Sequence, residues 1–284
     1  MQKENYRSKK NSHIILTIIK YLSLLLAVIV VVAPVLVILF AAFKTRSEFN
    51  VSGKLAMPNS FLYFDNFKTA FTDGGMITGL KNTVIIMAIS LAGTIIFGAM
   101  VAYVLDRFDF IGKKLVFGAY LVAMLIPMVT TQVATFKIIN ALGLFGTIWA
   151  PIVLYLGADV MSLYIMLLFM ESIHVSLDES AKLEGASYAY IFFRIILPNL
   201  KPAIATVAII RGVTIYNDFY IPFLYMPDQS LQTLSTSLYK FMGPYGGQWN
   251  VICAGVILII IPTLVAFLSL QKYIYNGFVN GSVK

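Results

Sequence analysis

Charged residues, cysteine and histidine are all scarce in this chain of 284 residues. Asp, Glu, Lys and Arg make up only 12% of it, whereas a soluble globular domain carries roughly 25%. The single cysteine, Cys253, excludes an internal disulfide framework, and a lone buried cysteine usually packs as a small hydrophobe. Two distant histidines, His13 and His174, form no cluster of metal ligands with it, so we expect no metal site.

Two enzymatic signatures are also missing. The pairs Gly53-Lys54 and Gly112-Lys113 are not followed by Ser or Thr, so the sequence lacks a phosphate-cradling loop and we expect no ATP hydrolysis. It has no Gly-x-Ser-x-Gly turn, and no catalytic groups converge at one membrane depth. We therefore expect no catalytic residue and no cofactor bound by this chain.

Apolar residues dominate instead, at 59% of the chain with a mean hydropathy of +0.84. About 20 consecutive apolar residues suffice to cross the hydrocarbon core of a bilayer as a helix. Six runs reach this length, at 21–43, 82–105, 115–136, 147–170, 203–226 and 251–270. The sequence therefore predicts an all-α integral membrane protein with six transmembrane helices in lipid, as one transmembrane domain over 21–284.

Lys and Arg residues set the expected orientation. A basic tail, 1–20, precedes the first run, which is too long for the apolar core of a signal peptide and is expected to be retained. With this tail in the cytoplasm, thirteen of the 21 Lys and Arg residues lie inside, seven lie outside and one lies within a span. This excess predicts that both termini and the loop 171–202 are cytoplasmic. It also explains the net charge of +8 without nucleic acid as a partner.

The loop 171–202 carries the features of a short capped helix. Ser176 and Glu179 have the spacing of a capping box, and Asp178 and Lys182 have the spacing of an ion pair on one helix face. Gly185 suits the left-handed conformation that ends a helix. These patterns predict a helix that begins at Ser176 and ends in a sharp turn.

A second helix is expected from about Ser187 to Ile196. Its apolar stripe consists of Ile191, Phe192, Ile195 and Ile196. Pro198 and Pro202 are expected to prevent its continuation into the fifth span. The residues alone leave two interpretations open: an interfacial connector packed on its own bundle, or a surface for a cytoplasmic partner.

Three charged residues fall within the predicted spans, where charge is costly and usually faces a protein interior or a wet cavity. Asp159 lies in the fourth span, and Arg211 and Asp218 lie seven apart in the fifth. They could line a path for a polar solute together with Tyr216 and Asn217. Alternatively, Arg211 forms a packing ion pair with Asp159 or Asp218. The sequence supports both interpretations.

The loop 171–202 resembles the Glu-Ala-Ala loop of ABC importer permeases. The resemblance is carried by Glu179-Ser180-Ala181, Gly185, Ile195 and Leu197-Pro198, with Ser180 in place of the first Ala. Further matches are Arg107-Phe108, Tyr216-Asn217-Asp218-Phe219 with Pro222, Gln271-Lys272-Tyr273 and the ending 280–284. Together these are most similar to the smaller, six-span permease subunit of maltose-transporter-type sugar importers.

This resemblance implies a coupling helix between the fourth and fifth spans that docks on a cytoplasmic ATPase dimer, which holds ATP and Mg. Glu179 would contact the ATPase, Ala181 would permit close approach and Gly185 would allow the turn. The other implied partners are a second permease, an extracellular solute-binding protein and a sugar, at the plasma membrane of a prokaryote. The outward loop 227–250 would meet the binding protein or pack at the membrane interface.

Two other classes remain as alternatives. An ion-driven transporter would work alone, but the chain lacks the repeated halves and paired broken spans typical of that class. An intramembrane enzyme would need convergent catalytic groups, which the sequence does not offer.

Overall fold

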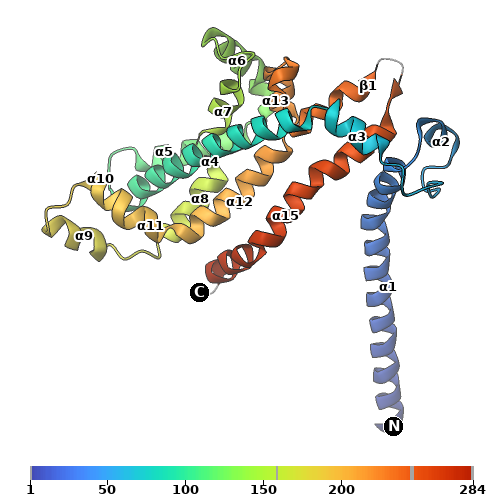
Figure 1. Ribbon diagram of the computed structural model, residues 1–284. Helices are drawn as coiled ribbons and strands as arrows, with labels where there is room; N and C mark the ends of the chain where they lie inside the picture. The colour runs from blue at the N-terminus through green and yellow to red at the C-terminus, as the bar shows by residue number, and fades with distance from the viewer. Residues whose placement is uncertain (1, 158, 244–245, 283–284) are drawn as a thin grey trace. The chain divides into compact units, whose positions relative to one another are not determined.

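The computed structural model describes the backbone of residues 2–157, 159–243 and 246–282, and the side chains of 16–157, 159–243 and 246–269. The C-terminal matches at 271–273 and 280–284 therefore lie outside the described side chains. The chain forms two compact units, which we treat separately. One comprises residues 1–74 and 240–258, and the other residues 75–239 and 259–284 (Figure 1).

The first unit is built around a single long apolar helix. It contains α1 (Gln2–Ala42), α2 (Arg46–Val51), α3 (Asp65–Thr72), the two-stranded hairpin β1 (Met242–Gly243) and β2 (Gly246–Gly247), and the start of α15 (Trp249–Ser282). Residues 2–20 of the predicted basic tail lie within the helical backbone of α1, whose apolar part is Leu16–Ala42. That part is almost entirely exposed within this chain, as expected of a helix surrounded by lipid or by other helices.

Buried amide and ammonium groups hold the end of α1 in place. Asn66 Nδ2 donates to the carbonyls of Ala42 and Lys44 at 2.8 Å, and Asn250 Nδ2 donates to Asn66 Oδ1 at 2.8 Å. The buried Lys44 ammonium donates to the Gly53 carbonyl at 3.0 Å. The bond to Ala42 satisfies a carbonyl that the end of α1 leaves without an intrahelical partner, and the other bonds fix the chain that follows.

The second unit consists of α4 and the helices gathered around it. Its longer helices are α4 (Met76–Arg107), α5 (Lys113–Leu125), α6 (Met128–Ala141), α7 (Trp149–Tyr155), α8 (Val160–Met170) and α12 (Lys201–Asn217). Its shorter segments are α9 (Ser176–Leu183), α10 (Tyr188–Tyr190), the π-helical η1 (Ile191–Ile196), α11 (Leu197–Asn199), α13 (Tyr220–Tyr225), η2 (Gln229–Leu231) and α14 (Leu234–Ser237), with the first half of η3 (Leu238–Phe241).

Small residues on α4 let α8 and α12 pack closely against it (Figure 1). Ala99 and Ala102 are fully buried in a core cluster with Leu163 and Met166 of α8 and Val207 of α12. Because membrane helices gain stability mainly from close packing, small side chains at such contacts favour association. The same cluster extends to the loop helices through Ile191 and related residues, so α4 connects the spans to the segment 176–200.

The predicted third span, 115–136, is broken. Pro127 has no backbone N–H, and Ile126 before it is extended, with φ −81° and ψ 114°. As a result α5 and α6 meet at 105°. With 13 and 14 residues, each half is about 20 Å long and too short to cross the hydrocarbon core alone.

Two further predicted spans are not continuous helices. The predicted run 147–170 consists of α7 and α8 at 46°, and 203–226 consists of α12 and α13, interrupted after Asn217. A 73° bend separates 188–199 from α12. Over the described residues, three continuous helices are long and apolar enough to cross a membrane, and up to six spans result if each of the bent pairs 113–141, 149–170 and 188–217 counts as one. The all-α membrane fold is thus confirmed, and six spans agree with it.

The segment 228–238 is hydrogen-bonded to residues near the start of α4. Asn82 Nδ2 donates to the carbonyls of Ser230 and Gln232, and Thr83 Oγ1 accepts the Leu234 N–H at 3.0 Å. Asp228 begins this segment, and its carboxylate accepts a hydrogen bond from the Ser230 N–H. This bond favours the ionised form and lowers the pKa of the Asp228 carboxyl below its usual value. These bonds fix the backbone of the segment against α4.

Gly79 is required for this contact, which gives a stability prediction. A Cβ at Gly79 would lie 3.1 Å from backbone atoms of Thr233 and Leu234, whereas a Cβ at the buried Gly98 would meet no atom within 4 Å. We expect Gly79→Ala to lose about 1–3 kcal/mol of stability through overpacking. Gly98→Ala should be neutral or stabilising, because alanine has the higher helix propensity.

Thermal unfolding of the two purified variants, followed by fluorescence-detected size exclusion, measures this difference. Equal unfolding midpoints would contradict the prediction, because they would show that the segment 228–238 shifts to accommodate the added Cβ without loss of stability.

Candidate coupling site

The helix α9 begins at Ser176 as predicted, but it is not capped as predicted. Val175 is its N-cap residue, Ser176 is already helical and no side chain caps the start, so the predicted capping box is wrong. The N–H groups of Asp178 and Glu179 bond instead to the Val175 carbonyl. Since the N-cap position is Val175 rather than Ser176, the Ser176 hydroxyl does not have the position from which a capping side chain accepts.

The predicted ion pair between Asp178 and Lys182 is also wrong. Asp178 Oδ2 lies 2.6 Å from Arg107 Nε at the end of α4, with the two side chains 3% and 6% exposed. Lys182 is exposed, and its ammonium lies 4.6 Å from the centre of the Tyr188 ring. A buried guanidinium is the stronger partner, because an exposed pair on one helix contributes little.

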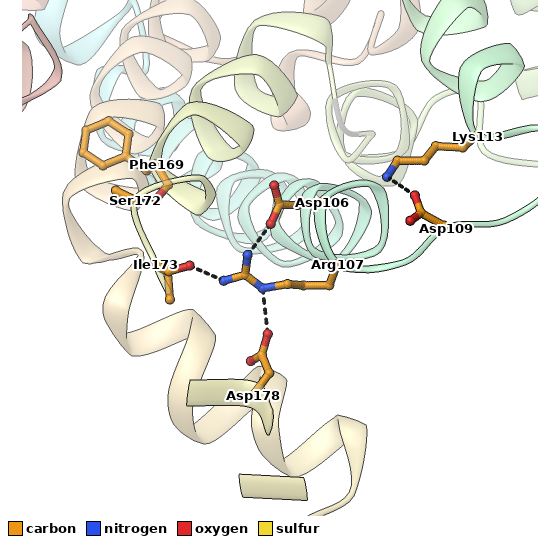
Figure 2. A network of polar contacts seen from close by, with 8 residues as sticks. All are labelled: Asp106, Arg107, Asp109, Lys113, Phe169, Ser172, Ile173 and Asp178. Carbon is orange, nitrogen blue, oxygen red and sulfur yellow. Dashed lines mark hydrogen bonds and ion pairs between the residues drawn. The ribbon is translucent and has the colours of Figure 1, made fainter. Parts of the chain in front are cut away.

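Arg107 is the centre of a polar network that sequence reasoning missed (Figure 2). Its guanidinium contacts Asp106, Asp178 and, at 2.5 Å, the carbonyl of Ile173. In the sequence analysis Arg107 was one of the positive charges near a membrane surface and part of the matching pair Arg107-Phe108, but no partner was predicted for it. The available signal was an acidic residue in the first turn of the loop helix, for which the basic end of the second span is a natural partner.

Gly185 ends α9 as predicted. Its φ is +84°, its N–H bonds to the Lys182 carbonyl and the Ala186 N–H bonds to the Ala181 carbonyl, both at 2.9 Å. These two bonds form a Schellman motif, which favours glycine at the left-handed position. The sharp turn between the two loop helices is therefore confirmed.

The two faces of α9 differ sharply in exposure. Asp178 and Ala181 are buried, and Ala181 belongs to the core cluster shared with α4 and α8. Glu179 and Ser180 are exposed, and Leu183 is 90% exposed. The small side chain of Ala181 thus permits close approach to this chain's own bundle, whereas the resemblance assigned that approach to a partner.

The second loop helix confirms its predicted apolar stripe. Ile191, Phe192 and Ile196 are buried, while Ile195 and Leu197 are half-buried. Pro198 is exposed and does not stop the helix, which continues to Asn199. The 73° bend follows at residue 200, because Pro202 fits the first turn of a new helix but cannot continue the previous one.

The intramembrane charges divide into two groups. Arg211 Nε lies 3.0 Å from Asp159 Oδ2, and the Arg211 and Asp159 side chains are 19% and 28% exposed. Asp159 also caps α8 through the N–H and hydroxyl of Ser162. Of the two partners considered for Arg211, the structure selects Asp159, and the pair joins α12 to the start of α8.

Asp218 has other partners. It ends α12, accepts the Tyr155 hydroxyl at 2.6 Å and accepts the N–H of Tyr220 at 2.8 Å. Tyr216 is buried and donates to the Ile259 carbonyl at 2.8 Å, whereas Asn217 is exposed. Of the five polar candidates, Asn217 is thus the one with an exposed side chain, while Asp218 and Tyr216 hold segments together.

The fold and the loop helix define a helical membrane transport component. The chain belongs to the family described as binding-protein-dependent transport system inner membrane component, whose model matches residues 94–278. Transport components of this family are not enzymes, in agreement with the expectation for this chain, and the loop motif and coupling helix are features of the family.

Named relatives support this family membership, and a solved structure has the same fold. The chain is 32% identical to the melibiose/raffinose/stachyose import permease protein MelC of Bacillus subtilis (strain 168), over 92% of this chain and 95% of that one. It is 30% identical to the maltodextrin transport system permease protein MalD of Streptococcus pneumoniae, over 93% and 94%. The crystal structure of a bacterial ABC transporter involved in the import of the acidic polysaccharide alginate contains a chain with the same fold. It matches with a TM-score of 0.78 and 18% identity, over 91% of this chain and 96% of that one.

Proposed function

We propose that this chain is the permease subunit of an ATP-driven importer for a sugar or oligosaccharide. It would form half of the path across the plasma membrane of a prokaryote, with both termini in the cytoplasm and a second permease as the other half. A cytoplasmic ATPase dimer, which holds ATP and Mg, would drive transport, and an extracellular binding protein would deliver the sugar. The observation that carries the proposal is the two-faced helix α9, anchored on one side and exposed on the other.

The exposed face of α9 suits a protein partner. Glu179 offers a carboxylate to a basic residue, and Ser180 beside it is small enough for close approach. Leu183 gains apolar burial on docking, since 90% of it is exposed in this chain. The Schellman turn at Gly185 holds this face in a fixed direction relative to the second loop helix. Closure of the ATPase dimer would then displace a rigid helix rather than a flexible loop.

The sugar assignment is supported by the relatives. MelC is named for melibiose, raffinose and stachyose, and MalD for maltodextrin. All of these are carbohydrates, although they differ in linkage and length. We therefore propose a carbohydrate as the substrate class. Asn217 is the polar candidate with an exposed side chain for a sugar hydroxyl, and the loop 227–250 is the segment that we propose meets the binding protein.

Reversal of the Glu179 charge tests the proposal. The chain is expressed with its neighbouring ATPase and second permease, purified, and reconstituted in proteoliposomes. We expect Glu179→Lys to reduce ATPase co-purification and ATP-driven uptake by at least about tenfold, which corresponds to about 1.4 kcal/mol of docking free energy. Glu171→Lys, an exposed charge reversal outside α9, should change neither quantity.

The opposite result is equally clear. If the chain alone concentrated solute on an ion gradient in liposomes without an ATPase, it would be an ion-driven transporter and the proposal would fail.

A further inference from the structure

We propose that the buried ion pair between Arg107 and Asp178 makes α9 and the end of α4 move as one body, so that displacement of α9 reaches the membrane helices. The inference rests on the proposed function, because it requires a partner that moves α9. Neither residue would touch the transported solute. Both are positioning residues that transmit a movement.

The helix α9 has few other attachments to the bundle. It is eight residues long, and an isolated helix of that length has little stability of its own. Asp178 and Ala181 are its two buried side chains. Ala181 contributes a single methyl group, which can slide over an apolar surface. The directional attachment of α9 is therefore Asp178.

The guanidinium of Arg107 joins three segments. It contacts Asp106 on its own helix, the Ile173 carbonyl that follows α8, and Asp178 in the first turn of α9 (Figure 2). The donors of a guanidinium lie in one rigid plane, so three partners fix its orientation as well as its position. The start of α9 is thus held against the ends of both α4 and α8.

Burial makes this pair difficult to separate. The Arg107 and Asp178 side chains are 6% and 3% exposed. Within the described residues, the buried Asp178 Oδ1 has no hydrogen-bond partner, so the carboxylate depends on its contact with Arg107. Pulling the two apart would leave a charge uncompensated away from water, which is strongly unfavourable.

An exposed pair nearby provides the contrast. Lys113 and Asp109 are 3.0 Å apart, but their side chains are 33% and 101% exposed. Water can replace either partner there, so this exposed pair contributes little stability. Lys113→Gln is therefore a matched control that removes an ion pair from the same end of the second unit (Figure 2).

Movement of the Arg107 end would spread into the spans. Ala99, Ala102 and Tyr103 on α4 are buried in one cluster with Met166 and Met170 of α8. A close-packed contact of this kind transmits displacement, because it has no free volume in which to yield. The ion pair therefore connects α9 to the two helices that pack most extensively in this unit.

A distance measurement tests whether α9 and α4 move together. In the full complex, with Cys253→Ala, spin labels are placed at Ser176→Cys in α9 and at Val84→Cys, an exposed position in α4. We expect pulsed electron resonance to give the same distance distribution without nucleotide and in an ATP-trapped complex. Asp178→Asn should broaden the distribution and shift it on ATP binding, while Lys113→Gln should not. A nucleotide-dependent shift with the pair intact would overturn the inference.

Transport separates coupling from mere packing. We expect Arg107→Gln and Asp178→Asn to assemble with the ATPase and hydrolyse ATP, but to import less raffinose or maltotriose per ATP. The amount of sugar imported per ATP hydrolysed should decrease by about 5–150-fold, the range typical of coupling between sites. The double variant Arg107→Asp with Asp178→Arg, which exchanges the two charges, should recover part of the lost import per ATP.

Single variants that import normally would overturn the inference, as would variants that lose assembly without recovery in the exchange. A wild-type chain that recruits no ATPase would overturn the proposed function first.

Discussion

Gly185→Val is expected to abolish ATP-driven uptake while the protein remains in the membrane. Valine at φ +84° has no steric clash to relieve, since a Cβ there would meet no atom within 4 Å, but its backbone is strained. The left-handed conformation costs a residue with a Cβ about 1–2 kcal/mol, and more when the side chain is β-branched. Relief of that strain opens the Schellman turn and redirects α9.

The measurement compares uptake with abundance in the membrane. We expect uptake to fall at least about tenfold, a factor equivalent to about 1.4 kcal/mol of activation free energy. Gly143→Val is the matched control, because Gly143 also has a positive φ, +68°, with no atom within 4 Å of a Cβ, but lies between α6 and α7. Full uptake by Gly185→Val at normal abundance would exclude the coupling role of the turn.

Arg211→Gln is expected to destabilise the assembled protein severely. It leaves the Asp159 carboxylate inside the membrane without its counter-ion, and loss of one partner from a buried pair costs about 3–5 kcal/mol. The partial exposure of both side chains, 19% and 28%, places the expected loss at the lower end of that range. The double variant Arg211→Gln with Asp159→Asn should recover most of the stability, because it removes both charges and asparagine still caps α8.

Thermal unfolding and uptake of the same samples distinguish the two roles considered for this pair. Arg194→Gln, which removes an exposed arginine, serves as the control and should leave both quantities unchanged. Normal unfolding of Arg211→Gln with altered uptake would instead assign Arg211 to the solute path.

Local signals in the sequence predicted much of the site. The apolar runs located the helices, Gly185 located the turn and the stripe at Ile191, Phe192 and Ile196 identified the buried face of the second loop helix. Each of these depends on a few neighbouring residues or on hydropathy alone. They hold because lipid and backbone geometry impose the same requirement in any fold.

Tertiary contacts set the features that the sequence did not predict. The pairing of Asp178 with Arg107 joins residues 71 positions apart and overrides the local Lys182. The N-cap of α9 is Val175 rather than Ser176, a shift of one residue that the local capping pattern did not reveal. Pro127 lies within the predicted span 115–136, and only its neighbours in the folded chain decide whether proline bends a membrane helix or divides it.

The π-helical segment η1 has a consequence for chain length. Its hydrogen bonds reach one residue further than those of an α-helix, so the segment contains an extra residue for nearly the same advance along its axis. Ile191 and Ile196, five positions apart, are both fully buried there, a spacing that an α-helical turn would place on different faces. A relative shortened by one residue at this point would form an ordinary helical turn in its place. A deletion of one residue would thus be absorbed within η1, and the segments before and after it would keep their register.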